Sequence, residues 1–311
     1  MGSTVQTVVG PVDVNDLDFI LPAEHIYQQG WEMGDISAYA LWQLEDDDVW
    51  AEEIEAFKGV GGTCLVDLTV PCMGRKPERL KALSERTGVH IVMATGWYVE
   101  NFVPPADDLE RRTVNAIAEQ MIREFEEGIG DTGIRPGVIG EFGARASWVS
   151  PLEERIHRAA ARAHNSTGLP MSTHSERSEV GLLQLDILEE EGADLTKVAI
   201  GHCDSWPMID YWTRIAERGA YVQLDNIGIQ MGRHEERLAA LTRELIDRGY
   251  VERILISHDV GMAPELAYYG GRGFTYLTQN FLPRLRDLGV EDDALRTITV
   301  NNPKRLLAQG R

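Results

Sequence analysis

The 311-residue sequence predicts an α/β protein folded as a (β/α)8 TIM barrel, and three observations support this fold class. Short apolar runs alternate with longer amphipathic runs along the chain. The apolar runs are hydrophobic throughout, which is typical of parallel strands covered on both faces. Eight such strand–helix units suit the length of a barrel. A doubly wound open sheet is the competing topology, but no glycine fingerprint for a dinucleotide follows the first apolar run.

Each predicted element has its own pattern. The strand segments are short apolar runs, and the helix segments carry apolar residues at helical spacing, often with a glycine at the end. Ser150 is predicted to cap one helix, because Pro151 and Glu153 follow it at the spacing of a capping box. All elements fall in one predicted domain, residues 1–311. We expect strands over 18–25, 63–69, 90–98, 137–143, 169–174, 197–203, 220–226 and 253–259, and helices over 47–61, 75–88, 108–130, 150–168, 179–192, 208–219, 233–249, 273–289 and 302–309.

The composition limits the partners and the compartment. Acidic residues outnumber basic ones 50 to 30, and the net charge of −20 disfavours binding to nucleic acid or to an anionic membrane. The three cysteines, Cys64, Cys72 and Cys203, show no paired spacing, which fits a reducing compartment. The first residues do not resemble a signal peptide, and no apolar run is long enough to cross a bilayer. We therefore expect a cytoplasmic protein that acts on a small molecule.

Residues that can bind a metal stand at the carboxyl ends of five predicted strands. In a barrel these ends meet at one mouth, where active sites lie. A single histidine at a strand end is more often a structural residue, and each of these positions alone has such an explanation. The chain has only eight histidines, however, and three of them occupy strand ends. The five residues are His25, Glu141, His174, His202 and Asp259.

The other histidines are expected elsewhere. His157, His164 and His234 lie on predicted helices and are interpreted as core or surface residues. His90 opens a strand and would lie at the opposite end of the barrel. His258 precedes Asp259, and strand alternation should turn it away from the site.

The chemistry of the five residues suits a metal-dependent hydrolase. Neutral imidazoles and carboxylates bind Zn²⁺, Mn²⁺, Fe²⁺ or Co²⁺. Glu141 has two carboxylate oxygens and is able to bridge two metals, which together lower the pKa of a water molecule. Asp259 would orient that water and transfer its proton to the leaving group.

Longer motifs resemble a known family. The segments GPVDVNDLDFILPAEH, ATGWY, GVIGEFG, MSTHSE, LLQLDILEEEGADLTKVAIGHCD, RGAYVQLDNIG and RILISHD span nearly the whole chain. They resemble the phosphotriesterase family of the amidohydrolase superfamily, which includes phosphotriesterase-like lactonases and phosphotriesterase-related proteins. The resemblance implies a barrel with a two-metal centre, hydrolysis of organophosphate triesters, lactones, esters or amides, and a homodimer.

The resemblance also implies roles for individual residues. His174 and His202 match the ligands of the more exposed metal, and His25 and Asp259 match those of the more buried metal. Glu141 matches the bridging position, which is a carbamylated lysine in some members. Tyr98 matches a tyrosine that lies beside the activated water in the lactonases, although a rim aromatic is an equally good interpretation.

Two positions depart from the family pattern. The first strand of the family ends in His-x-His, and here the first histidine is replaced by Ala23. The replacement is either a deliberate removal of a ligand, a natural alteration to a changed or single metal centre, or the mark of a non-catalytic binding protein. In each case we expect the more buried metal to bind more weakly. The second departure is Asp225-Asn226, where lactonases of acyl-homoserine lactones usually carry Asp-Arg.

The function expected from the resemblance is hydrolysis of a carboxylic ester, lactone or amide, with zinc as the first metal to consider. The alternatives are organophosphate triester hydrolysis and a non-catalytic small-molecule-binding barrel. Loop residues rich in Met and Tyr suggest an apolar or aromatic substrate, although packing or dimer contacts explain them equally well. The predicted substrate-binding residues are Trp97, Tyr98, Asn226, Met231, Tyr269 and Arg272.

Overall fold

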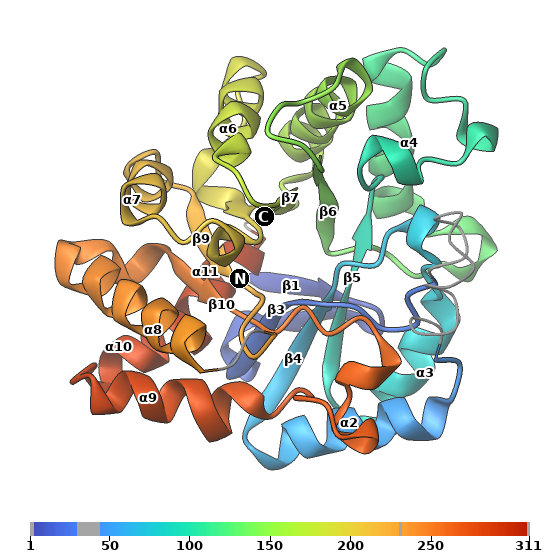
Figure 1. Cartoon of the computed structure of the whole chain (residues 1–311). Coiled ribbons are helices and arrows are strands. Elements are labelled where there is room, and N and C mark those ends of the chain that lie inside the picture. Colours follow the sequence, from blue (N-terminus) through green and yellow to red (C-terminus); the bar gives the residue numbers. More distant parts are fainter. Residues whose placement is uncertain (1–2, 30–43, 230–231, 310–311) are drawn as a thin grey trace.

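The computed structural model describes residues 3–29, 44–229 and 232–309. Eight parallel strands form a nearly closed barrel in sequence order (Figure 1), which confirms the predicted fold class. Their apolar side chains are buried on both faces, as expected for strands with helices outside and a packed interior. The strands are β3 (Phe19–Glu24), β4 (Gly62–Asp67), β5 (His90–Thr95), β6 (Val138–Ala144), β7 (Met171–Ser175), β8 (Val198–Ile200), β9 (Tyr221–Leu224) and β10 (Ile254–Ile256).

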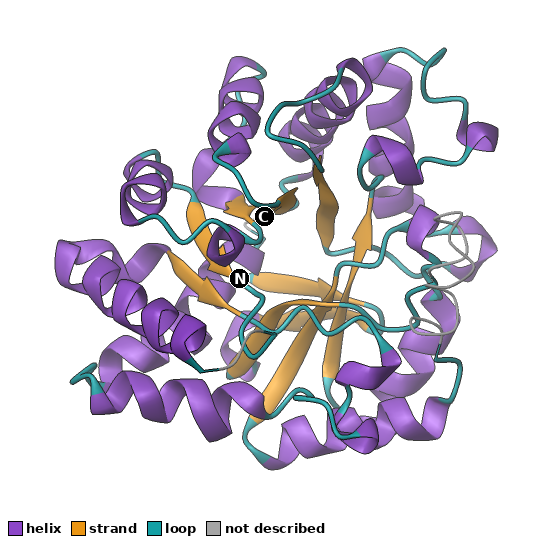
Figure 2. Ribbon diagram, viewed as in Figure 1, coloured by secondary structure: helices purple, strands orange, loops and turns teal. Residues whose placement is uncertain are grey.

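Helices form the outer layer of the barrel (Figure 2). The predicted capping box is present at the start of α5: the Ser150 hydroxyl accepts a hydrogen bond from Glu153 N–H, and the Glu153 carboxylate accepts one from Ser150 N–H. None of the helices in the described ranges combines the length and the apolar character that a membrane span requires. The helices are α2 (Asp47–Gly59), α3 (Pro77–Thr87), α4 (Val114–Glu127), α5 (Pro151–Thr167), α6 (Val180–Glu190), α7 (Ile209–Glu217), α8 (Arg233–Leu245), α9 (Leu282–Asp287), α10 (Asp292–Arg296) and α11 (Asn302–Leu307).

Two helix predictions need correction, and one helix was not predicted. The helix predicted over 108–130 begins only at Val114, because the Thr113 side chain accepts a hydrogen bond from Ala116 N–H and so caps it there. It ends before Gly128, whose φ of 98° is not helical. The helix predicted over 273–289 is shorter and enters α9 through a π-helical turn at Leu277–Phe281. Helix α10 was not predicted.

An N-terminal hairpin that was not predicted lies at the amino end of the barrel. It consists of β1 (Thr4–Thr7) and β2 (Gly10–Asp13), paired antiparallel. The Val8 N–H donates to the Ile91 carbonyl at 2.9 Å, which ties the hairpin to the start of β5. Gln309 N–H donates to the Thr4 carbonyl at 2.8 Å, so the two ends of the described chain lie together (Figure 1).

Side chains inside the barrel form a compact apolar cluster. Ala23 belongs to it and is 1% exposed, so its methyl group lies within the barrel instead of on the outer surface. The hairpin contributes Val5 to the same cluster. The polar site described below therefore lies above a largely apolar interior. Other members are Ile20, Cys64, Val66, Val92, Ala94 and Val138.

The seam between β3 and β10 is closed by backbone bonds just beyond the strands. The Asp259 N–H donates to the Ala23 carbonyl at 3.2 Å, and the His25 N–H donates to the Val260 carbonyl at 2.9 Å. The buried Glu24 carboxylate reinforces this seam, because it accepts hydrogen bonds from the Val260 N–H at 2.8 Å and from His258 Nδ1 at 2.9 Å. Two predicted site residues, His25 and Asp259, are thereby fixed on either side of the seam.

Candidate metal centre

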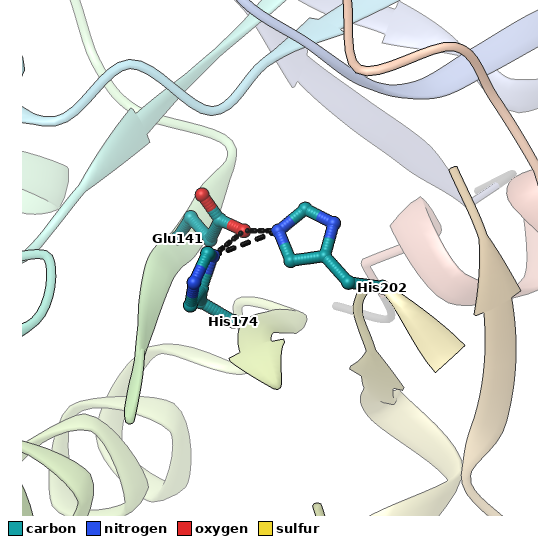
Figure 3. Close-up of side chains that lie close together, drawn as sticks. All are labelled: Glu141, His174 and His202. Atoms are coloured by element: carbon teal, nitrogen blue, oxygen red, sulfur yellow. Dashed lines mark hydrogen bonds and ion pairs between the residues drawn. The ribbon is translucent and has the colours of Figure 1, made fainter. Parts of the chain in front are cut away.

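Three of the five predicted ligands form a tight group at the carboxyl ends of neighbouring strands (Figure 3). Glu141 Oε1 lies 2.6 Å from His202 Nε2 and 3.0 Å from His174 Nδ1. The two histidine nitrogens are 2.8 Å apart. One oxygen and two nitrogens that converge in this way, all on buried side chains, match the donor set of a divalent transition metal.

His202 is oriented by the carboxylate of Asp225, which directly follows β9. Its Nδ1 lies 2.8 Å from Asp225 Oδ1, and its backbone N–H donates to the same carboxylate at 2.9 Å. Because the carboxylate accepts a hydrogen bond from Nδ1–H, the Nε2 lone pair is left facing Glu141. This arrangement is typical of a metal-ligating histidine with a supporting carboxylate.

The other two predicted ligands form a second pair beside the first group. His25 Nε2 lies 3.3 Å from Asp259 Oδ1 and 3.7 Å from Glu141 Oε2. His25 Nδ1 lies 3.1 Å from the Thr69 hydroxyl, which itself donates to Asp67 at 2.7 Å. Thr69 therefore accepts from Nδ1, and Nε2 faces the site. Glu141 turns one oxygen to each group.

Opposite charges dominate the electrostatics. Burial disfavours charge on His202, but Asp225 and Glu141 outweigh it and hold the His202 pKa well above its usual value. Burial is also outweighed at His25, chiefly by Asp259, and its pKa rises to about 9. Burial likewise opposes the charge on Glu141, yet the adjacent histidines hold its pKa well below the usual range. The site stabilises positive charge, and a divalent cation would supply that charge in place of imidazole protons.

Two of the site residues adopt a left-handed backbone conformation. His202 and Asp259 each have a φ of 54°, in a region that non-glycine residues seldom occupy. Their backbone N–H groups bond Asp225 and Ala23, respectively, which holds both residues in place. Residues held in such conformations cluster at functional sites.

His258 and the other remaining histidines lie where the sequence suggested, with one exception. His258 points away from the site, since its Nδ1 bonds Glu24 and its Nε2 accepts from Leu277 N–H at 3.1 Å. His157 is buried in the core beside Phe142. His234 is the exception, because it lines the cavity above the metal group.

A cavity of about 540 Å³ opens above these residues. Two of the predicted substrate-binding residues, Tyr98 and Asn226, line it. The Tyr98 hydroxyl lies 3.0 Å from His174 Nδ1. Burial raises the pKa of Tyr98 well above its usual value, with further contributions from Glu141 and Asp259, so its hydroxyl keeps its proton.

Three of the other predicted substrate-binding residues, Trp97, Tyr269 and Arg272, do not line this cavity. Trp97 turns the opposite way from Tyr98 and donates its indole N–H to Asp107 at 2.7 Å. Tyr269 is 51% exposed and its ring contacts Tyr268 instead. Arg272 is held by Glu265 at 3.1 Å and by the His258 carbonyl at 2.6 Å. Met231 lies outside the described residues.

Several cavity residues were missed from the sequence, because loops and a helix start bring them to the mouth. Glu176 and Arg177 follow β7 directly, so their short distance from His174 along the chain could have marked them. His234 begins α8 far from any predicted ligand, and no sequence pattern pointed to it. The missed residues are Gln28, Met73, Glu176, Arg177, Asp204, Ser205, Ile229, His234, Gly261 and Glu265. Met262, one of the loop methionines expected near the substrate, also lines the cavity.

A (β/α)8 barrel with carboxylate and imidazole donors grouped at its carboxyl mouth defines a class of metal-dependent hydrolases. Residues 3–307 match the model of the Phosphotriesterase family, and the chain belongs to this family. The family resemblance inferred from the motifs is thereby confirmed.

Named relatives extend this result. The Phosphotriesterase homology protein of Escherichia coli is 36% identical over 241 residues, covering 78% of this chain and 82% of the relative. The N-acetyltaurine hydrolase of Dictyostelium discoideum is 31% identical over 277 residues, covering 85% of this chain and 74% of the relative. The crystal structure of a lactonase from Listeria monocytogenes superposes with a TM-score of 0.92 at 25% identity, covering 99% of this chain and all of that one. Family members thus include hydrolases of different substrates.

Proposed function

We propose that this protein hydrolyses a carboxylic ester, a lactone or an amide with the help of bound divalent metal, zinc being the first candidate. The observation that carries the proposal is the convergence of Glu141, His174 and His202 at the floor of a cavity. Relatives named as a lactonase and as an N-acetyltaurine hydrolase support hydrolysis at a carboxylic centre.

In this proposal the donors fall into two sets. His174, His202 and Glu141 would hold the first metal, and His25, Asp259 and Glu141 would hold the second. Bound metal would lower the pKa of a water molecule and polarise the acyl oxygen under attack. The supporting bonds from Asp225 and Thr69 keep the two Nε2 lone pairs directed inward.

Asp259 and Tyr98 take the proton-handling and orienting roles. Burial raises the pKa of Asp259, but His202 and His25 outweigh it and the net shift is downward, so the carboxylate is ready to accept a proton. Asp259 would take the proton from the attacking water and pass it to the leaving group. Tyr98, which keeps its proton, would donate a hydrogen bond to the acyl oxygen.

Ala23 weakens the second metal set in this proposal. A histidine at that position would add an imidazole near His25 and Asp259, whereas the methyl group offers no donor. The second set is left with one histidine, one aspartate and a shared glutamate. We propose that the second metal binds more weakly than the first for this reason.

The first experiment measures metal content by elemental analysis of protein purified without added metal. We expect about one metal per chain, and about two in Ala23→His. An Ala23→His protein that holds no more metal than the unmodified chain would refute the role given to Ala23. Both proteins are then loaded with zinc and assayed on a lactone, an ester, an amide and an organophosphate triester. The absence of turnover of every substrate by both proteins would overturn the hydrolase proposal in favour of a binding barrel.

A further inference from the structure

Among the residues that the structure describes, the wall of the cavity carries one side chain that is positively charged at neutral pH whatever its surroundings. Arg177 is the only arginine or lysine lining it, and it follows His174 by three residues. Acidic side chains at the cavity are more numerous, but most of them already have partners. Glu141 and Asp259 face the histidines of the metal centre, and Glu265 is paired with Arg272 at 3.1 Å.

Arg177 makes no ion pair within the described part of the chain, although its immediate neighbour in sequence is acidic. Glu176 is directed instead toward the metal group, where its Oε2 lies 3.9 Å from His174 Nε2. Several arginines elsewhere on the surface are held by carboxylates; Arg218, for example, lies 2.6 Å from Asp186 and 2.8 Å from Glu189. The guanidinium of Arg177 is therefore available to a ligand.

The backbone at Arg177 is held in a conformation that seldom carries a long side chain. Its φ is 52°, in the left-handed region that non-glycine residues seldom occupy. The Arg177 N–H donates to the Ser205 hydroxyl at 2.7 Å, which fixes the loop after β7 to the loop after β8. Ser205 also lines the cavity, so this bond holds Arg177 at the mouth.

The rest of the cavity wall suits a short, partly apolar chain between the metal centre and Arg177. Met73, Ile229 and Met262 supply apolar surface, and His234 supplies a further imidazole. An arginine binds a carboxylate or sulfonate with two parallel hydrogen bonds, which fixes both the position and the direction of the ligand.

We propose that the substrate carries an anionic group, a carboxylate or a sulfonate, which Arg177 binds at the cavity mouth while the acyl bond lies over Glu141, His174 and His202. This inference rests on the proposed hydrolytic function and narrows its substrate class. It replaces the apolar or aromatic substrate suggested by the loop composition. Arg177 is then a specificity residue, because it discriminates between charged and neutral molecules of equal shape.

The test uses matched substrate pairs on the zinc-loaded protein. One pair is N-acetyltaurine and the neutral sulfone N-[2-(methylsulfonyl)ethyl]acetamide; the other is N-acetyl-β-alanine and its carboxamide. The two pairs separate a sulfonate preference from a carboxylate preference. For at least one pair we expect kcat/KM to be at least tenfold higher for the anion. Arg177→Gln should lower that ratio by roughly 10- to 100-fold, mainly through KM, as expected for one charged hydrogen-bonding partner.

Two further variants make the result specific. Arg177→Lys keeps the positive charge but not the two parallel N–H donors of the guanidinium. It should therefore restore part of the preference in kcat/KM for the anion. Arg237→Gln is the matched control, because Arg237 is an exposed arginine on α8 that does not line the cavity. In this variant the ratio of kcat/KM for the anion to kcat/KM for the neutral molecule should equal that of the unmodified protein. Equal ratios for Arg177→Gln and the unmodified protein, or a preference for the neutral molecules in both pairs, would overturn the inference.

A binding measurement separates failure of the inference from failure of the proposed function. If no amide is hydrolysed, the hydrolytic proposal fails for these substrates, and calorimetric titration of the same four molecules then decides the role of Arg177. Anion binding that weakens at least tenfold in Arg177→Gln supports the anion site without catalysis. Equal binding by both proteins, or no binding of either anion, contradicts it.

Discussion

At the scale of single residues, the site depends on groups that fix which nitrogen of each histidine faces inward. His202 has Asp225 behind it and His25 has Thr69 behind it, so both present Nε2 to the centre. The direction of the side chain also separates Tyr98 from Trp97. The two residues are adjacent in sequence, yet only Tyr98 reaches the cavity.

The support for His202 leads to a prediction about metal affinity. Asp225→Asn keeps the shape of the side chain but removes the charge that favours a proton on His202 Nδ1. We expect the affinity for zinc to fall about 10- to 100-fold, as is typical when such a supporting carboxylate is changed. Competition with a chromophoric chelator measures the affinity directly. The exposed Asp131→Asn serves as control, and an affinity in Asp225→Asn equal to that of the control would contradict the prediction.

At the scale of elements, the site residues whose positions are set by regular strands were predicted from the sequence, whereas those whose positions are set by loops were missed. The carboxyl ends of parallel strands necessarily meet, so His25, Glu141, His174, His202 and Asp259 were expected together, and the structure places them around one cavity. The β1–β2 hairpin was missed because its two strands, TVQT and GPVD, contain no apolar run of the kind that marked the barrel strands. His234 was missed because its place depends on where the loop after β9 delivers α8, which no local pattern specifies.

The hairpin yields a prediction about stability. A Cβ atom at Gly137, at the start of β6, would collide with the Gln6 carbonyl of β1 and with a methyl group of Val92. Gly137→Ala must therefore displace the hairpin from the barrel, and we expect a loss of about 1–3 kcal/mol in the free energy of unfolding. Urea unfolding measures it. Gly59→Ala, where a Cβ meets nothing within 4 Å, is the matched control and should be neutral or slightly stabilising. Two variants of equal stability would show that the hairpin adapts freely.

At the scale of the whole molecule, acidity affects the barrel through groups far from the metal. The protein carries 50 acidic and 30 basic residues, so its net negative charge shrinks as the pH falls. Inside the core, however, His157 must stay neutral. Its Nδ1 lies 2.7 Å from the Glu153 carbonyl, its ring contacts Phe142, and its buried Nε2 has no partner among the described residues.

His157 therefore makes stability depend on pH in a defined window. Burial lowers its pKa from 6.5 to about 4. Between these values the unfolded chain binds the proton and the folded chain does not, so protonation favours unfolding. The contribution of His157 to the free energy of unfolding is constant above pH 6.5. Below that pH it falls by about 1.4 kcal/mol for each pH unit, until the pH approaches 4.

We expect His157→Gln to lose this pH dependence of stability, although the variant is less stable at pH 7.5 because it loses packing against Phe142. The measurement compares urea unfolding of the two proteins at pH 7.5 and 5.5, where the other titrating groups contribute equally to both. The unmodified protein should lose about 1.4 kcal/mol more than the variant over this interval. Parallel pH profiles would mean that His157 is protonated in the folded barrel, and that its core position tolerates a charge.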